Sequence, residues 1–260
     1  MIYYVDVPAT AATAVDTFHL MGDSRRWRLL EELSAGDRRV GELSRATGDP
    51  QNLVSYHLRL LRDAGLVDAR RSTHDGRDTY YRADLDRCAN VLCEAGATLS
   101  PSLHLTVVPV IPRRGRRPYR VLFLCTGNSA RSQMAAALLT HRSHGGIRAD
   151  SAGSHPKELH PAAVRVMTEH GIDISANTTK HLDRFARTRF DAVITVCDKV
   201  REVCPEFPGG PVAIHWSIPD PNSADPDEGD SPFRATADEL EVRVRHLMTR
   251  IATERQGAAS

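Results

Sequence analysis

The sequence lacks several features that would place it in whole classes of protein. It has no uninterrupted run of about 18–20 apolar residues, and its first ten residues lack the charged-then-apolar order of a secretory signal. We therefore expect a cytoplasmic protein with no membrane partner. Its five cysteines are an odd number in 260 residues. That count argues against a disulfide scaffold and favours reduced thiols, some of them reactive.

An excess of charge of one sign is also missing. The 34 basic and 33 acidic residues leave a net charge of +1, so overall charge indicates no polyanionic partner. Lysine, however, is absent from residues 1–118, which use arginine alone as their cation. The two ends of the chain therefore differ in composition.

Residues 99–118 show neither helical nor strand periodicity. They hold four prolines, a glycine and a cluster of arginines, a composition that favours an extended connector because each proline fixes φ and removes a hydrogen-bond donor. We predict a first domain at 1–100, a linker at 101–118 and a second domain at 119–260.

The first domain is predicted to be mainly α-helical with one hairpin. Gly48 allows a tight turn, Asp49 is expected to cap the next helix, and Pro50 is expected at its first helical position. The expected helices span 25–33, 40–46, 51–64 and 84–99, and the expected strands span 66–72 and 78–82. The side chains expected to face inward are Trp27, Leu29, Leu30, Leu33, Leu53, His57, Leu60, Leu61 and Ala64.

This order of elements predicts a winged helix-turn-helix. Gln and Asn can pair with adenine edges, Arg with guanine, and Ser or Tyr hydroxyls with phosphates. The alternative is an ordinary amphipathic helix with a solvated face, but the capped turn, the hairpin and the arginine-only charge favour operator DNA as a partner. The expected DNA contacts are Gln51, Asn52, Ser55, Tyr56, Arg59 and, at the hairpin tip, Arg77.

At QNLVSYHLRLLRDAGLV the first domain resembles the ArsR/SmtB family of metalloregulatory repressors, over about residues 14–99. The resemblance implies a repressor that forms a homodimer through its first and last helices, with each recognition helix in a major groove. One departure is clear. Many members carry a thiol metal motif in the helix before the recognition helix, whereas residues 39–43 read RVGEL.

The second domain opens with an apolar strand at 119–124, a loop that starts at Cys125, and a helical run at 134–141. Loop N–H groups and a helix N-terminus that converge on one point bind an oxyanion and lower a thiol pKa. Arg131 can grip two oxygens with its planar fork, and Ser132 can hydrogen-bond the thiolate. The alternative, a buried structural Cys at a strand end, does not explain these offsets. The expected oxyanion loop is Thr126, Gly127, Asn128, Ser129, Ala130 and Arg131.

Two further groups complete the catalytic candidates. Cys197 follows a second buried strand at 190–196, and Cys204 lies seven positions later in a Pro/Gly-rich loop, so the two thiols can pair if that segment rearranges. They could instead be purely structural thiols. Asp220 lies on a Pro-stiffened loop, where a carboxyl could protonate a leaving oxygen. The full candidate set is Cys125, Asn128, Arg131, Ser132, Cys197, Cys204 and Asp220.

In this order, the pieces resemble the low-molecular-weight phosphotyrosine-phosphatase fold, and within it the thioredoxin-coupled arsenate reductases. The resemblance implies an α/β three-layer domain with a four-stranded parallel sheet, which makes the chain a multidomain protein. Ala130 and Gln133 match the reductase form, whereas phosphatases usually have Cys and Pro there. Ala136 replaces an acidic residue that helps some members hold potassium, so we predict no cation site.

The resemblance implies a thiol relay with no bound cofactor. Cys125 attacks arsenate, Cys197 then attacks Cys125 and releases arsenite, and Cys204 attacks Cys197 to give a disulfide that thioredoxin reduces. Alternatives are a regulator whose second domain is a phosphatase, or one that binds oxyanion without turnover. Transfer to a low-molecular-weight thiol would leave Cys204 idle.

The thiols of the first domain, Cys88 and Cys93, are candidate arsenite ligands. Five residues turn a helix by about 500°, so the two thiols would lie roughly 140° apart on one regular helix. A frayed helix, or thiols shared across a dimer axis, would bring them together. The alternative is that both are small apolar residues packed in a dimer interface.

Overall fold

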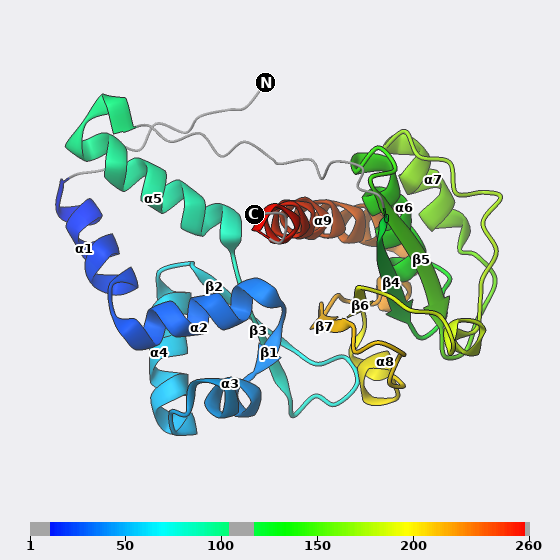
Figure 1. Cartoon of the computed structure of the whole chain (residues 1–260), viewed down its shortest axis with the longest axis horizontal. Coiled ribbons are helices and arrows are strands. Elements are labelled where there is room, and N and C mark those ends of the chain that lie inside the picture. The colour runs from blue at the N-terminus through cyan, green and yellow to red at the C-terminus, as the bar shows by residue number, and fades with distance from the viewer. Residues whose placement is uncertain (1–10, 104–116, 258–260) are drawn as a thin grey trace. The chain divides into compact units, whose positions relative to one another are not determined.

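The computed structural model describes residues 11–103 and 117–257, which form two compact units (Figure 1). Among the described residues, the first unit consists of 11–71 and 78–103, and the second consists of 117–257 together with the turn at 72–77. Most of the predicted linker at 101–118 therefore lies outside the described residues. None of the helices in the described part of the chain is long and apolar enough to cross a membrane.

The first unit is mainly helical, with a small antiparallel sheet of order β1-β3-β2. This arrangement confirms the predicted mainly-α helix-turn-helix with a β-hairpin wing. Its elements are α1 (Ala11–Met21), α2 (Ser24–Ala35), β1 (Arg38–Arg39), α3 (Val40–Thr47), α4 (Gln51–Asp63), β2 (Val67–Arg71), β3 (Thr79–Ala83), α5 (Leu85–Leu99) and a 3-10 turn, η1 (Pro101–Leu103).

The start of α4 differs from the prediction. Gly48 does take a left-handed turn, with φ of 76°, but Pro50 is the N-cap and α4 begins at Gln51. The inward face also differs: it includes Val54 and Leu58 beside His57 and Leu61, whereas Leu53 and Leu60 are only half-buried and Ala64 is exposed.

Trp27 was also wrongly expected in the core. Its side chain is 47% exposed, and its indole N–H donates to Glu31 at 2.9 Å on the surface of α2. Leu29, Leu30 and Leu33 fill the core face of this helix without it. A period of 3.6 residues allows either placement of the indole, so the spacing alone does not decide it.

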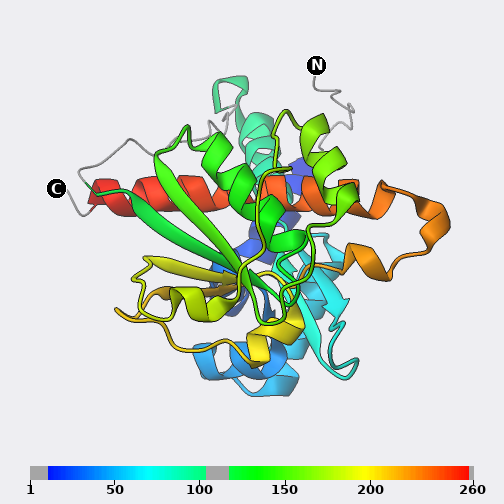
Figure 2. The ribbon, with the colours of Figure 1, turned by 90° about the vertical axis from the view of Figure 1, so that its right-hand side faces the viewer.

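The second unit is an α/β domain with a parallel sheet of order β5-β4-β6-β7. Figure 2 faces this unit. The sheet confirms the predicted four parallel strands. The elements are β4 (Tyr119–Cys125), α6 (Arg131–Arg142), β5 (Ile147–Gly153), α7 (Pro161–Glu169), η2 (Leu182–Phe185), β6 (Ala192–Thr195), α8 (Asp198–Glu202), β7 (Val212–His215), η3 (Pro221–Ser223), η4 (Pro226–Glu228) and α9 (Ser231–Gly257).

Strand β4 is the centre of this domain. Its residues 121–124 are an unbroken apolar run and are fully buried, as expected for a parallel strand covered on both faces. Helices α6 and α9 pack against each other and add Met134, Leu138 and Leu240 to the same core. Burial of this kind contributes roughly 25 cal/mol per Å² of apolar surface.

The strand order also determines where a ligand can bind. The chain passes from β4 to β5 on one side and then returns to β6 on the other side of β4. Because parallel crossovers are almost always right-handed, these two connections leave on opposite faces and open a crevice at the carboxyl end of β4. Cys125 is the last residue of that strand.

Candidate active site

The loop between β4 and α6 is built against the end of β5. Gly153 lies opposite Cys125 in the parallel register. A Cβ on Gly153 would lie 2.6 Å from the carbonyl oxygen of Thr126 and 2.8 Å from the amide nitrogen of Asn128. Only glycine therefore lets the loop approach the sheet so closely. Gly153 is not among the predicted site residues, although a glycine at the end of a buried strand is a signal of close backbone approach.

The carbonyl groups of the loop are held by the segment that follows β5. The amides of His155, Lys157 and His160 donate to the carbonyls of Thr126, Gly127 and Ser129 at 2.8, 2.9 and 2.9 Å. In a planar trans peptide the N–H points away from the C=O. The N–H groups of the following residues are thereby directed away from this segment, and that of Asn128 donates to the Cys125 Sγ at 3.1 Å.

A series of hydrogen bonds, in which each group donates to the next, runs from Lys180 to the same sulfur. The backbone N–H of Lys180 donates to Asn128 Oδ1 at 2.7 Å, which orients the amide so that Asn128 Nδ2 donates to Ser132 Oγ at 2.9 Å. Ser132 Oγ lies 3.0 Å from Cys125 Sγ. Since this hydroxyl already accepts from Asn128, its own proton is available to the sulfur. The backbone N–H of Asn128 and the hydroxyl of Ser132 therefore both stabilise a thiolate at Cys125.

Asn128 adopts a left-handed backbone conformation, with φ of 48°. This region is uncommon for residues other than glycine, although asparagine tolerates it better than most. Its fully buried side chain holds the strained turn through the contacts to Ser132 and Lys180.

Arg131 and Asp220 meet at the mouth of the loop. Arg131 is the first residue of α6 and is buried, and its Nη2 lies 2.8 Å from Asp220 Oδ2. Its Nη1 donates to the carbonyl of Ile218 at 3.0 Å, which fixes the plane of the fork. The Asp220 side chain is 38% exposed and also accepts from the amide of Asn222.

Cys197 lies against the same loop from the end of β6. Its Sγ is 3.4 Å from Thr126 Oγ1, and it is the N-cap residue of α8. Burial raises the pKa of the Cys197 thiol, while the nearby Arg131 opposes that change. Burial also raises the pKa of Cys204, which follows α8 and is half-buried. Both groups are therefore thiols at neutral pH until a partner activates them.

The DNA-facing residues predicted on α4 all lie on its exposed face. Gln51, Asn52, Ser55, Tyr56 and Arg59 are exposed, and the Arg59 guanidinium lies 5.7 Å from the centre of the Tyr56 ring. Arg77, in the turn between β2 and β3, is exposed as well.

Comparison with known proteins agrees with this geometry. Residues 120–257 match the family described as low molecular weight phosphotyrosine protein phosphatase, and residues 23–69 match the arsR family of bacterial regulatory proteins. The chain belongs to the low molecular weight phosphatase family. Both resemblances found in the sequence are thereby confirmed.

The similar proteins align with the second unit. An arsenate reductase of Halalkalibacterium halodurans is 37% identical over 129 residues, or 48% of this chain and 91% of the relative. A glutaredoxin arsenate reductase of Synechocystis sp. is 31% identical over 133 residues, or 51% and 98% of the two chains. A solved thioredoxin-dependent arsenate reductase of Corynebacterium glutamicum is 29% identical, covers 54% and 65% of the two chains, and superposes with a TM-score of 0.44.

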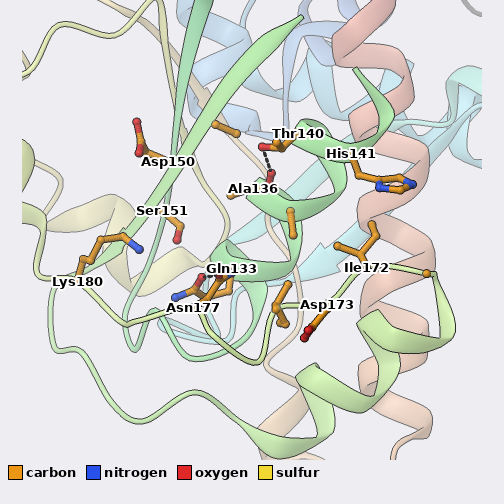
Figure 3. A pocket seen from close by; sticks show the side chains of 14 residues that line it. Gln133, Ala136, Thr140, His141, Asp150, Ser151, Ile172, Asp173, Asn177 and Lys180 are labelled. Atoms are coloured by element: carbon orange, nitrogen blue, oxygen red, sulfur yellow. Dashed lines mark hydrogen bonds between the residues drawn. The ribbon is translucent and has the colours of Figure 1, made fainter. Parts of the chain in front are cut away.

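This low molecular weight phosphatase domain also has a pocket behind the loop, of about 460 Å³ (Figure 3). Its walls come from α6, β5 and the segment 171–180, and they include Ala136 and Lys180. Gln133 lies at one end, where it donates to the carbonyl of Thr178 and accepts from Asn177. Gln133 and Lys180 thus connect the pocket wall to Asn128, a connection that the sequence analysis did not foresee.

Cys88 and Cys93 are both half-buried on α5. Burial, and to a smaller extent the charge of Asp84, raises the pKa of Cys88 to about 11. Within the described ranges, no group of three or more His, Cys, Asp or Glu side chains is arranged to hold a metal ion.

Proposed function

We propose that the chain is a bifunctional arsenic-resistance protein, an ArsR-type repressor fused to an arsenate reductase. One observation carries the enzymatic half. Cys125 lies in an oxyanion cradle, and Cys197 lies against Thr126 of that cradle. A phosphatase of the same fold needs the first feature but has no use for the second. Two relatives that align with this chain over nearly their whole length are named arsenate reductases.

The first step is nucleophilic. Cys125 attacks arsenic as a thiolate, and the loop N–H groups and the Arg131 fork take up the oxyanion charge. Asp220, which lies beside Arg131 at the mouth of the loop, acts in its protonated form: it gives its proton to the departing hydroxide, which leaves as water, and becomes a carboxylate. The product is a Cys125–S–As(V) adduct.

The next two steps move electrons. The Cys197 sulfur attacks Cys125 Sγ, the S–As bond breaks, and its electron pair stays on arsenic, which leaves as As(III) arsenite. A Cys125–Cys197 disulfide remains. Cys204 then attacks Cys197, Cys125 leaves as a thiolate, and the new Cys197–Cys204 disulfide is reduced by a dithiol protein, which we take to be thioredoxin.

The regulatory half acts on operator DNA through α4 and the wing. The exposed set from Gln51 to Arg59 reads base edges, while Arg77 meets the phosphates. The repressor forms a homodimer through α1 and α5, and arsenite made by the second domain weakens DNA binding through Cys88 and Cys93. We keep the domain bounds 1–100, 101–118 and 119–260 for this arrangement.

A turnover experiment tests the enzymatic half. Purified full-length protein is given arsenate or p-nitrophenyl phosphate, with thioredoxin, with glutaredoxin plus glutathione, or with neither. Arsenite formation that depends on thioredoxin supports the proposal. Arsenite formation that depends on glutaredoxin would still support a reductase, but with glutaredoxin in place of thioredoxin as its reductant. Rapid phosphate release without arsenite would favour the phosphatase, and binding with no turnover of either would favour an oxyanion sensor.

A further inference from the structure

A buried polar cluster lies directly beside the proposed relay, although the relay chemistry does not use it. Asp198 follows Cys197 in the chain, and its Oδ1 accepts from Ser217 Oγ at 2.6 Å and lies 3.2 Å from His215 Nε2. The other ring nitrogen of His215 lies 2.8 Å from Thr195 Oγ1. All four side chains are buried. The cluster therefore joins the ends of β6 and β7 to the first residue of α8.

Helix α8 separates the two cysteines of the proposed final disulfide. Cys197 caps its N-terminus, and Cys204 follows its end at Glu202 by two residues. A helical segment of this length keeps the two Cα atoms on the order of 10 Å apart at 1.5 Å rise per residue. A disulfide needs about 4.4–6.8 Å. Forming the Cys197–Cys204 bond therefore requires α8 to unwind.

In this structure, α8 is intact while the cysteines on either side of it are free thiols. All five cysteines are unpaired, and α8 spans Asp198–Glu202. A helix of five residues has little stability of its own, so tertiary contacts must hold it. The fully buried Val200 supplies one anchor, and Asp198 supplies the other: its Oδ1 contacts His215 and Ser217, and its Oδ2 accepts from the amide of Thr73 at 2.8 Å.

We propose that Asp198, held by His215 and Ser217, is a positioning residue that stabilises the reduced form of the Cys197/Cys204 pair. The proposal rests on the relay described above. The contacts belong to the wound helix and are lost when it unwinds, so their free energy favours the dithiol over the disulfide. Stabilising a reduced form makes the corresponding disulfide a stronger oxidant. The cluster thereby eases the last step, in which an external dithiol gives two electrons and two protons to the pair.

The equilibrium can be measured without arsenate. In the full chain, Cys88, Cys93 and Cys125 are replaced by Ser, so that the only thiols are Cys197 and Cys204. The protein is equilibrated in dithiothreitol buffers of graded redox potential, quenched in acid, alkylated and weighed by mass spectrometry. This titration gives the reduction potential of the pair.

Ser217→Ala and Asp198→Asn are compared in that background. We expect the equilibrium to shift toward the disulfide by about tenfold in Asp198→Asn, which corresponds to a potential about 30 mV more negative. Ser217→Ala should shift it in the same direction by less. Ser143→Ala, which removes a buried hydroxyl between α6 and β5, is the matched control and should leave the potential unchanged.

The outcomes separate this proposal from the function on which it rests. Equal potentials in parent, Asp198→Asn and Ser217→Ala, or a shift toward the dithiol, would overturn the role of Asp198 and leave the relay intact. Failure of the parent to form the disulfide in any buffer would overturn the relay itself. If Asp198→Asn does not fold, Ser217→Ala alone decides, because it keeps the contact between Asp198 and His215.

Discussion

Cys125 of the second unit and Cys88 of the first lie in different surroundings. In the second unit, Cys125 faces an N–H of its own loop and a serine hydroxyl oriented toward it. In the first unit, burial and, to a smaller extent, the charge of Asp84 disfavour a thiolate at Cys88, whose sulfur faces the carbonyl oxygen of Leu66 at 4.0 Å. The difference teaches that the surroundings of a thiol determine its reactivity, because cysteine occurs in both places. The predictions below test that contrast.

The largest effect is expected at the nucleophile. Cys125→Ser should abolish arsenate reduction, since a hydroxyl in the same cradle stays protonated near neutral pH. Arg131→Lys should lower kcat by about 100- to 1000-fold, because a point charge cannot replace the fork. Steady-state arsenite formation measures both. Retention of most of the wild-type kcat by Cys125→Ser would remove it as the nucleophile.

Cys197→Ser and Cys204→Ser should both stop multiple turnover, but at different stages. The first variant should hold the Cys125 adduct and release no arsenite. The second should release one equivalent and stop at a Cys125–Cys197 disulfide. Mass spectrometry after a single turnover distinguishes these products. Sustained turnover by either variant would contradict the relay.

A smaller loss of activity is expected when a substitution displaces the loop after Cys125 but leaves its reactive side chains in place. Gly153→Ala places a methyl group against main-chain atoms of residues 126 and 128, which cannot move aside cheaply. We expect a stability loss of about 1–3 kcal/mol and a marked fall in kcat. Gly127→Ala meets only side-chain atoms, the nearest being Ser129 Oγ at 3.0 Å, and should cost less. Gly76→Ala, in open space, is the control for thermal unfolding. The reverse order of effects would refute the close-approach argument.

In the first unit, Arg59→Ala and Gln51→Ala should each weaken operator binding by about 1–3 kcal/mol if they contact base edges. Arg77→Ala should instead weaken binding to operator and scrambled DNA alike and flatten the salt dependence. Binding at two salt concentrations tests both. No DNA binding by the full chain at low salt would overturn the regulatory half.

The smallest effect is expected at the α5 thiols. Arsenite should release operator from the wild type but less from Cys88→Ser and Cys93→Ser, with the three enzyme cysteines replaced by Ser throughout. Because the Cys88 pKa is about 11, its alkylation at pH 8 should be slower than that of an unperturbed thiol. Equal release from all three proteins, or no release from any, would remove these thiols as the sensor.

The parts of the molecule that the sequence predicted well are local in the chain. The strand, loop and helix from Tyr119 to Arg142 follow one another directly, so their order alone indicates an oxyanion cradle. The start of α4 was displaced by one residue because Pro50 can either cap a helix or begin it. The inward position of Val54 in place of Leu53 depends on how α4 packs against the rest of the unit, and the 3.6-residue spacing does not contain that information.

The groups that the sequence did not predict come from distant segments. Gly153, Lys180 and His155 reach the loop only after β5 pairs with β4 and the following segment packs beside it. Asp198 is next to Cys197 in the chain, but its partners His215 and Ser217 come from another strand end. Sequence spacing does not contain such pairings, because parallel register is a tertiary property.

The direction of the hydrogen bonds through Asn128 has a consequence for the lifetime of the protein. Asparagine side chains can lose their amide with age and become aspartate. At position 128 that change would replace a donor by an oxygen that only accepts. The Ser132 hydroxyl, now 2.9 Å from Asn128 Nδ2, would turn its proton toward the new carboxylate and away from the sulfur. Ageing at this one amide would therefore take a hydrogen bond from the thiolate without removing any atom of the nucleophile itself.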